Sequence, residues 1–249
     1  MKTIFLFGDS TCQYNDSTTF PQVGWGQFFN EYIKDEYRIV NLAKNGRSTK
    51  TFKEEELFEP CQKEIKEGDF IFIQFGHNDA KVNSERFTEP YKDYQENLLF
   101  YADIARKVRA TPVFLSSIYR RHFKLFHLDP NCHGEYPNAM KQLAEKENII
   151  FLDITKASKK YIEKLGRKKS KELFMISAKG KYDYPEKTFD NTHLVEKGAR
   201  AMCELIKKEC LANDTLKEII KWNYFNVSTY AIMRGPTPLA SLLTIFSEI

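Results

Sequence analysis

The chain has 249 residues, a length that suits one large α/β domain or a domain with a small appendage. Lysine and arginine number 38 against 34 aspartates and glutamates, so the net charge is only +4, and its scatter argues against a nucleic acid partner. Even the densest basic run, residues 167–171, is typical of a solvated loop rather than of a polyanion site. Five cysteines without a CxxC pair indicate free thiols in a reducing compartment and exclude a zinc ribbon.

The start of the chain, MKTIFLFG, is a short apolar run that ends at Gly8. A secretory signal needs about 7–15 apolar residues, so this run predicts a strand and not a signal peptide. No stretch approaches the roughly 18–20 apolar residues of a membrane span. We therefore expect a cytoplasmic protein with no membrane partner, and the sequence does not give its oligomeric state.

Short apolar runs alternate with amphipathic stretches along the chain. We expect strands at 3–7, 37–43, 69–75, 111–118 and 148–154, because these runs are apolar on both faces. We expect helices near 25–35, 52–66, 91–109, 136–147 and 195–211. This alternation predicts an α/β protein, a three-layer α/β/α sandwich around a parallel, flavodoxin-like sheet. Residues 1–211 form this domain, and residues 212–249, which contain Pro236 and Pro238, form an extension of unknown role.

Glycine with polar side chains follows each of the first three predicted strands, as GDST (8–11), NGRS (45–48) and GHND (76–79). Parallel sheets bind ligands at the carboxyl ends of their strands, so we expect the three segments to share one edge. Within the third segment we expect His77 and Asp79 to be structural hydrogen-bonding partners.

The same edge can supply the parts of an acyl-transfer site. Ser10 offers a hydroxyl, and Asp190 and His193 lie three residues apart, a spacing that lets them meet on one loop while the other imidazole nitrogen faces a serine. The backbone N–H groups of Ser10 and Gly46 and the side-chain amide of Asn78 can surround an oxyanion. No G-x-S-x-G segment occurs, which excludes the nucleophile elbow of the α/β-hydrolases.

A resemblance to a known family rests on these segments. GDST (8–11), Gly46, GHND (76–79) and DNTH (190–193) resemble, in order and spacing, the four blocks of the SGNH, or GDSL-type, hydrolases. Further stretches resemble the bacterial rhamnogalacturonan acetylesterases, namely GWGQFF (24–29), NGRSTKTF (45–52), GHNDA (76–80) and HGEYPNAMKQLAE (133–145). Thr11 stands where the wider family has leucine, a variant that the acetylesterase branch shares.

The resemblance covers residues 3–208 and implies nothing for 212–249. It implies the SGNH hydrolase fold, a catalytic triad of Ser10, Asp190 and His193, and an oxyanion hole made by Ser10, Gly46 and Asn78. It implies no metal and no other cofactor.

The stretch 119–137 is long for a connection in an α/β protein and rich in arginine, histidine and aromatic residues. Arg121, together with Arg120, suits the carboxylate of a uronic acid sugar, and His133 is a further candidate for substrate binding. The spacing of three histidines and a cysteine in this loop matches no known metal-ligand pattern (His122, His127, Cys132 and His133).

The function that we predict is therefore removal of O-acetyl groups from a carbohydrate, such as an acetylated oligosaccharide of rhamnogalacturonan or pectin. A lipase or thioesterase on the same fold would share the mechanism. A metallophosphoesterase is a more distant alternative, since its blocks read in a different order. A sugar-binding module without catalysis would have no need of a triad.

Overall fold

The computed structural model describes residues 1–125, 127–177 and 188–221. Five parallel strands form its central sheet in the order β2-β1-β3-β4-β7. Their bounds are β1 Lys2–Gly8, β2 Tyr37–Asn41, β3 Phe70–Gln74, β4 Thr111–Leu115 and β7 Ile150–Leu152. This is the flavodoxin-like order, and each strand overlaps a stretch for which the sequence predicts one, with β1 one residue longer at each end than the predicted 3–7.

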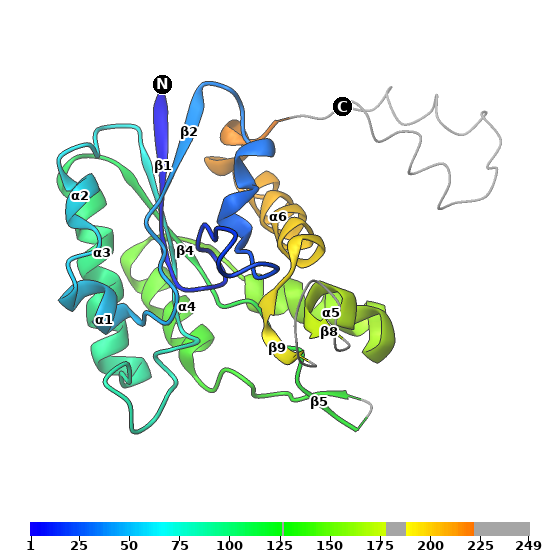
Figure 1. The fold of residues 1–249 in the computed structure, drawn as a ribbon. Helices are drawn as coiled ribbons and strands as arrows, with labels where there is room; N and C mark the ends of the chain where they lie inside the picture. The colour runs from blue at the N-terminus through cyan, green and yellow to red at the C-terminus, as the bar shows by residue number, and fades with distance from the viewer. Residues whose placement is uncertain (126, 178–187, 222–249) are drawn as a thin grey trace, which may run out of the picture.

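Two hydrophobic cores lie on opposite faces of the sheet, since successive side chains of a strand point to opposite faces. Ile4 and Leu6 of β1 pack in one core, and Phe5 and Phe7 pack in the other. Figure 1 shows α1 to α4 on one side of the sheet and α5 and α6 on the other. Their bounds are α1 Thr49–Glu54, α2 Glu59–Gln62, α3 Gln95–Lys107, α4 Tyr136–Glu147, α5 Ile154–Lys169 and α6 Glu196–Leu211. The predicted three-layer α/β/α sandwich is confirmed.

Two predicted helices are shorter than expected. The stretch 25–35 forms only the 3₁₀ turns Trp25–Gln27 and Phe29–Glu31, because it packs directly on the loop after β1. A Cβ on Gly24 would lie 2.3 Å from the carbonyl oxygen of Gln13, so only glycine permits this approach. The stretch 52–66 divides into α1 and α2 around Glu56, because its φ of 52° is incompatible with a right-handed α-helix.

One helix and two antiparallel pairs of strands lie where the sequence predicts none. Helix α5 begins directly after β7, where Asp153 caps it by accepting a hydrogen bond from the N–H of Lys156. Strands β8 Phe174–Ser177 and β9 Thr188–Leu194 pair antiparallel beside α6. A smaller antiparallel pair, β5 Phe123–Lys124 and β6 His127–Leu128, lies within the long stretch 119–137.

The packed domain continues beyond residue 211. The 3₁₀ turn Leu216–Ile219 is buried at both ends, and Ile220 forms a β-bridge with Ile33. Residues 212–221 are therefore part of the domain and not of a separate extension, and the remainder, 222–249, lies outside the described residues. Within the described ranges, no helix combines the length and apolar character needed to span a membrane.

Candidate active site

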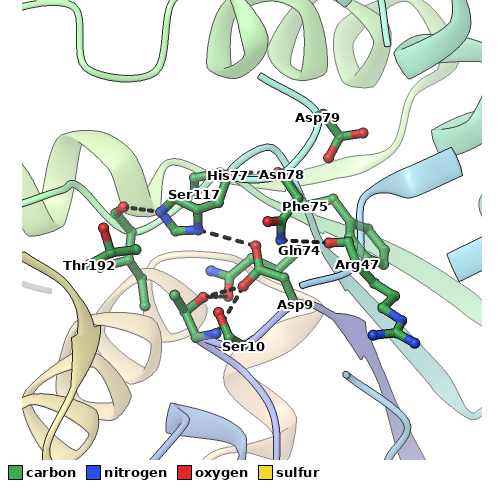
Figure 2. Close-up of polar contacts among 12 residues, drawn as sticks. Asp9, Ser10, Arg47, Gln74, Phe75, His77, Asn78, Asp79, Ser117 and Thr192 are labelled. Atoms are coloured by element: carbon green, nitrogen blue, oxygen red, sulfur yellow. Dashed lines mark hydrogen bonds and ion pairs between the residues drawn. The ribbon is translucent and has the colours of Figure 1, made fainter. Parts of the chain in front are cut away.

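The strand order places three loops side by side at one edge of the sheet. Because β1 lies between β2 and β3, the loop that carries Ser10 is flanked by the loops that carry Gly46 and Asn78. The side-chain amide of Asn78 donates a hydrogen bond to the carbonyl oxygen of Arg47 at 2.9 Å, which ties the two outer loops together (Figure 2). The topology thus brings together three residues that are far apart in the sequence.

Ser10, His193 and Asp190 form one chain of hydrogen bonds. His193 Nε2 lies 3.0 Å from Ser10 Oγ, and its Nδ1 lies 2.6 Å from Asp190 Oδ2. A proton on Nδ1 that is donated to the carboxylate leaves Nε2 as an acceptor for the serine hydroxyl. This is the arrangement that activates a serine for nucleophilic attack.

Asp190 and His193 lie on strand β9, and not on a loop as the sequence predicts. Residues three apart on a regular strand point to opposite faces, so their contact needs a local bend. Asp190 Oδ1 supplies it by accepting hydrogen bonds from the backbone N–H groups of Thr192 at 2.7 Å and His193 at 3.0 Å. This turn folds His193 back onto the carboxylate.

The carboxyl group of Asp190 is held in its ionised form. Its partial burial would raise its pKa, but the hydrogen bonds from the His193 ring and backbone outweigh burial and keep the pKa well below its usual range. The Asp190 and His193 side chains are 32% and 31% exposed, so solvent reaches this end of the site.

Gly46 and Asn78 lie on the two loops that flank the Ser10 loop. Gly46 has a φ of +78°, a conformation that other residues adopt only with strain. The Asn78 amide carries two N–H groups and donates one to Arg47, which leaves the second for another acceptor.

Behind Ser10, Asp9 and His77 form a buried pair (Figure 2). Asp9 Oδ2 lies 3.1 Å from His77 Nδ1, while Asp9 Oδ1 accepts hydrogen bonds from the N–H and hydroxyl of Thr11. Burial would raise the pKa of Asp9, but His77 and Thr11 lower it. His77 Nε2 faces the carbonyl oxygen of Ile118 at 2.9 Å, so His77 has the structural role that we expect from the sequence.

Asp79 links the loop after β3 to the start of α1. Its Oδ1 accepts hydrogen bonds from the N–H of Thr49 at 2.9 Å, the Thr49 hydroxyl at 2.5 Å and the Thr88 hydroxyl at 3.1 Å. In the described part of the chain, no group hydrogen-bonds to its buried Oδ2. Complete burial raises the pKa of Asp79 to about 7, against the opposing effect of these hydrogen bonds.

Arg121 is placed differently from the prediction that it contacts a substrate carboxylate. Its side chain is 3% exposed, and its guanidinium donates to Ser170 Oγ, Asn191 Oδ1 and the carbonyl oxygen of Arg167. The Arg121 backbone N–H also donates to the carbonyl oxygen of Asn191 at 2.8 Å. Arg121 therefore braces the segment that carries Asp190, and a substrate does not reach it directly.

The other candidate residues of the stretch 119–137 are also used internally. His133 is buried behind His77, and its Nε2 lies 3.0 Å from the carbonyl oxygen of Ile118. Burial, His77 and Arg120 hold the pKa of His133 well below its usual range, so it is a neutral core residue and not a substrate ligand. Arg120 donates to the hydroxyl of Thr192 at 2.7 Å and to the carbonyl oxygen of His77 at 3.1 Å.

Sequence reasoning did not single out Gln74, which organises the interior below Ser10. Its Oε1 accepts hydrogen bonds from Trp25 Nε1 at 2.7 Å and from the Thr11 hydroxyl at 3.3 Å. A glutamine at the end of an otherwise apolar strand is the signal in the sequence that could have identified it. Within the described ranges, no cluster of histidine, cysteine and acidic residues is arranged to hold a metal ion.

Comparisons with known proteins relate this chain to a family of hydrolases. Residues 4–206 match the family described as GDSL-like Lipase/Acylhydrolase. The chain is 38% identical over 204 residues to the rhamnogalacturonan acetylesterase RhgT of Bacillus subtilis (strain 168). The aligned region covers 82% of this chain and 87% of RhgT. The chain is 39% identical over 207 residues to the probable rhamnogalacturonan acetylesterase YesY of the same organism, with coverage of 82% and 90%.

Solved structures show the same fold. YxiM of Bacillus subtilis superposes with a TM-score of 0.72 at 24% identity, over 85% of this chain and 56% of that one. A catalytic mutant of Axe2, an acetylxylan esterase from Geobacillus stearothermophilus, superposes with a TM-score of 0.58 at 15% identity, over 84% of this chain and 93% of that one.

Proposed function

Because the chain belongs to the GDSL-like lipase/acylhydrolase family, we propose that it is a carbohydrate O-acetylesterase with Ser10 as its nucleophile. The observation that carries this proposal is the hydrogen-bonded chain from Ser10 Oγ through His193 to Asp190. The substrate class rests on the relatives, two of which are named rhamnogalacturonan acetylesterases and match more than four fifths of this chain. The proposed substrate is an acetylated oligosaccharide of rhamnogalacturonan, and the proposed pathway is pectin degradation.

The first half of the proposed reaction transfers the acetyl group to the enzyme. His193 Nε2 takes the proton of the Ser10 hydroxyl, and Ser10 Oγ attacks the acetyl carbonyl carbon. The carbonyl oxygen becomes an oxyanion that receives hydrogen bonds from the Ser10 N–H, the Gly46 N–H and the Asn78 amide. The bond between the carbonyl carbon and the sugar oxygen then breaks, and His193 gives its proton to that oxygen, which leaves as the sugar hydroxyl.

The second half releases acetate. His193 takes a proton from water, the resulting hydroxide attacks the acetyl carbon, and the bond to Ser10 Oγ breaks as His193 returns the proton to Ser10. Asp190 keeps one ring orientation throughout and stabilises the imidazolium that forms in each half-reaction. This sequence uses side chains and backbone groups of the chain and water.

Acetate release from a substrate panel tests the proposal. We expect the protein to release acetate from acetylated rhamnogalacturonan oligosaccharides faster than it hydrolyses long-chain acyl esters. Faster cleavage of the long-chain esters would favour a lipase or thioesterase, and metal-dependent cleavage of a phosphodiester would favour a metallophosphoesterase.

The Ser10→Ala variant tests the assignment of the nucleophile. Its kcat should fall on the order of 10⁴-fold or more, because the attacking oxygen is removed. A variant that keeps a tenth of the wild-type rate toward an aryl acetate would show that Ser10 is not the nucleophile.

A further inference from the structure

A basic cavity lies beside the strand that carries Asp190 and His193. Its volume is about 290 Å³. Its walls come from the stretch after β4, the end of α5 and strand β9, and include Arg121, His122, Phe123, Arg167, Lys171 and Phe189. None of the described residues that line it is acidic. The cavity is therefore a place of positive potential.

The cavity shares strand β9 with the proposed catalytic site. Asn191 lines it and follows Asp190 in the chain. Both the Nη1 and the backbone N–H of Arg121 donate to Asn191 at 2.8 Å. Phe189 and Asn191, the two residues that flank Asp190 in β9, both line the cavity.

The cations of the cavity differ in their availability. Arg121 is buried and uses its guanidinium within the protein, so it contributes positive potential and not contact. Arg167 and Lys171 are exposed, and Arg167 donates to the carbonyl oxygen of Leu125 through Nη1, which leaves its Nε and Nη2 for another acceptor. His122 lies 3.6 Å from the carboxylate of Asp129 and is directed toward that partner.

The aromatic residues of the cavity complement its charge. The Arg121 guanidinium lies over the Phe123 ring, 5.2 Å from its centroid. Phe189, which precedes Asp190, is 64% exposed. An exposed ring next to cations offers an apolar surface for the C–H face of a sugar whose carboxylate reaches the cations.

We propose that this cavity binds the carboxylate of a uronic acid residue in the saccharide whose acetyl group is removed at Ser10. The proposal rests on the proposed function and adds a second site of contact to it. Arg167 and Lys171 bind the carboxylate, Phe189 covers the sugar face, and Arg121 maintains the positive potential behind them.

Matched substrates and variants test this subsite. One substrate is an acetylated rhamnogalacturonan oligosaccharide with free uronate carboxylates, and the second is the same oligosaccharide with those carboxylates methyl-esterified. The variants are Lys171→Gln and the double change Arg167→Gln with Lys171→Gln. The control is Lys168→Gln with Lys169→Gln, which removes the same charge from the same exposed basic run without changing a residue that lines the cavity.

We expect wild-type kcat/KM to favour the free acid, and this preference to weaken as salt is added. In the double variant, the ratio of kcat/KM on the free acid to kcat/KM on the methyl ester should fall about tenfold. This corresponds to somewhat under 1 kcal/mol for each partly exposed cation. Lys171→Gln alone should lose about threefold, and the control variant should keep the wild-type ratio.

Equal kcat/KM on the two substrates in the wild type would overturn the subsite and leave the proposed function standing. An unchanged ratio in the double variant, or an equal loss of ratio in the control, would do the same. Failure of the wild type to release acetate from either oligosaccharide or from an aryl acetate would instead overturn the proposed function. These two failures are distinct.

Discussion

Replacing Asp79 with asparagine should remove a pH-dependent loss of stability from this protein. Burial raises the pKa of Asp79 from an ordinary value of 3.8 to about 7. A difference of about three pKa units corresponds to about 4 kcal/mol, since one unit is about 1.4 kcal/mol. The tyrosines that face Asp79 have pKa values that burial raises further above 10, so they stay neutral in this range (Tyr94, Tyr101 and Tyr136).

Because the pKa of Asp79 is raised in the folded protein, the stability that Asp79 contributes decreases as the pH rises. The folded state binds the Asp79 proton more tightly than the unfolded state, so this contribution to stability is complete below about pH 4. It is lost as the pH rises through about 7, where the folded protein must hold an ionised carboxylate with one unpaired oxygen. Asparagine keeps an acceptor for Thr49 and Thr88 but has no proton to lose in this range.

Urea unfolding at pH 5 and pH 8 measures the effect. The free energy of unfolding of the wild type should decline over this interval by about 3 kcal/mol relative to Asp79→Asn. Asp35→Asn, which changes a carboxyl that is 93% exposed, is the matched control and should follow the wild type. If Asp79→Asn and the wild type show the same dependence on pH, Asp79 is ionised in the folded protein and the reasoning from its burial is wrong.

Three further substitutions separate the proposed roles at the site. Asn78→Ala should lower kcat roughly 10²–10³-fold in a steady-state assay, and a loss confined to KM would identify Asn78 as a substrate-binding residue instead. Gly46→Ala should lower the free energy of unfolding by about 1 kcal/mol, and with it the melting temperature, because a residue with a Cβ is strained at a φ of +78°. An unchanged melting temperature would mean that the loop relaxes without strain. Arg121→Ala should lower the melting temperature and reduce turnover of an aryl acetate and of an acidic oligosaccharide together, since its side chain braces Asn191 and Ser170. A loss on the acidic substrate alone, with an unchanged melting temperature, would restore direct contact between Arg121 and a uronate.

The central strands could be predicted from the sequence because each is a continuous apolar run between polar loops. The position of Ser10 beside Gly46 and Asn78 followed from topology, since the ends of neighbouring parallel strands meet at one edge. The pairing of Asp190 with His193 was visible as a spacing of three residues. The bend that makes it possible on a strand depends on two backbone hydrogen bonds that no spacing reveals.

The role of Arg121 could not be read from its own segment. Its partners Asn191 and Arg167 lie 70 and 46 residues away, so only the folded chain shows that the guanidinium is already used. The replacement of the first predicted helix, 25–35, by two 3₁₀ turns has a similar origin. It depends on the close approach of Gly24 to the loop after β1, a contact made by tertiary packing and not by local propensity.

The hydrogen bond between Ser10 and His193 joins residues that are 183 positions apart in the chain. A contact of such long sequence separation carries a large cost in closure entropy, so we expect it to form late in folding. The end of strand β9 is also held beside the start of the chain, where the carbonyl oxygen of Leu194 accepts a hydrogen bond from the N–H of Val23. In a refolding experiment, we therefore expect the proposed esterase activity to recover later than the helical circular dichroism signal. The delay between the two signals would measure how long β9 takes to pack against the N-terminal segment that carries Ser10.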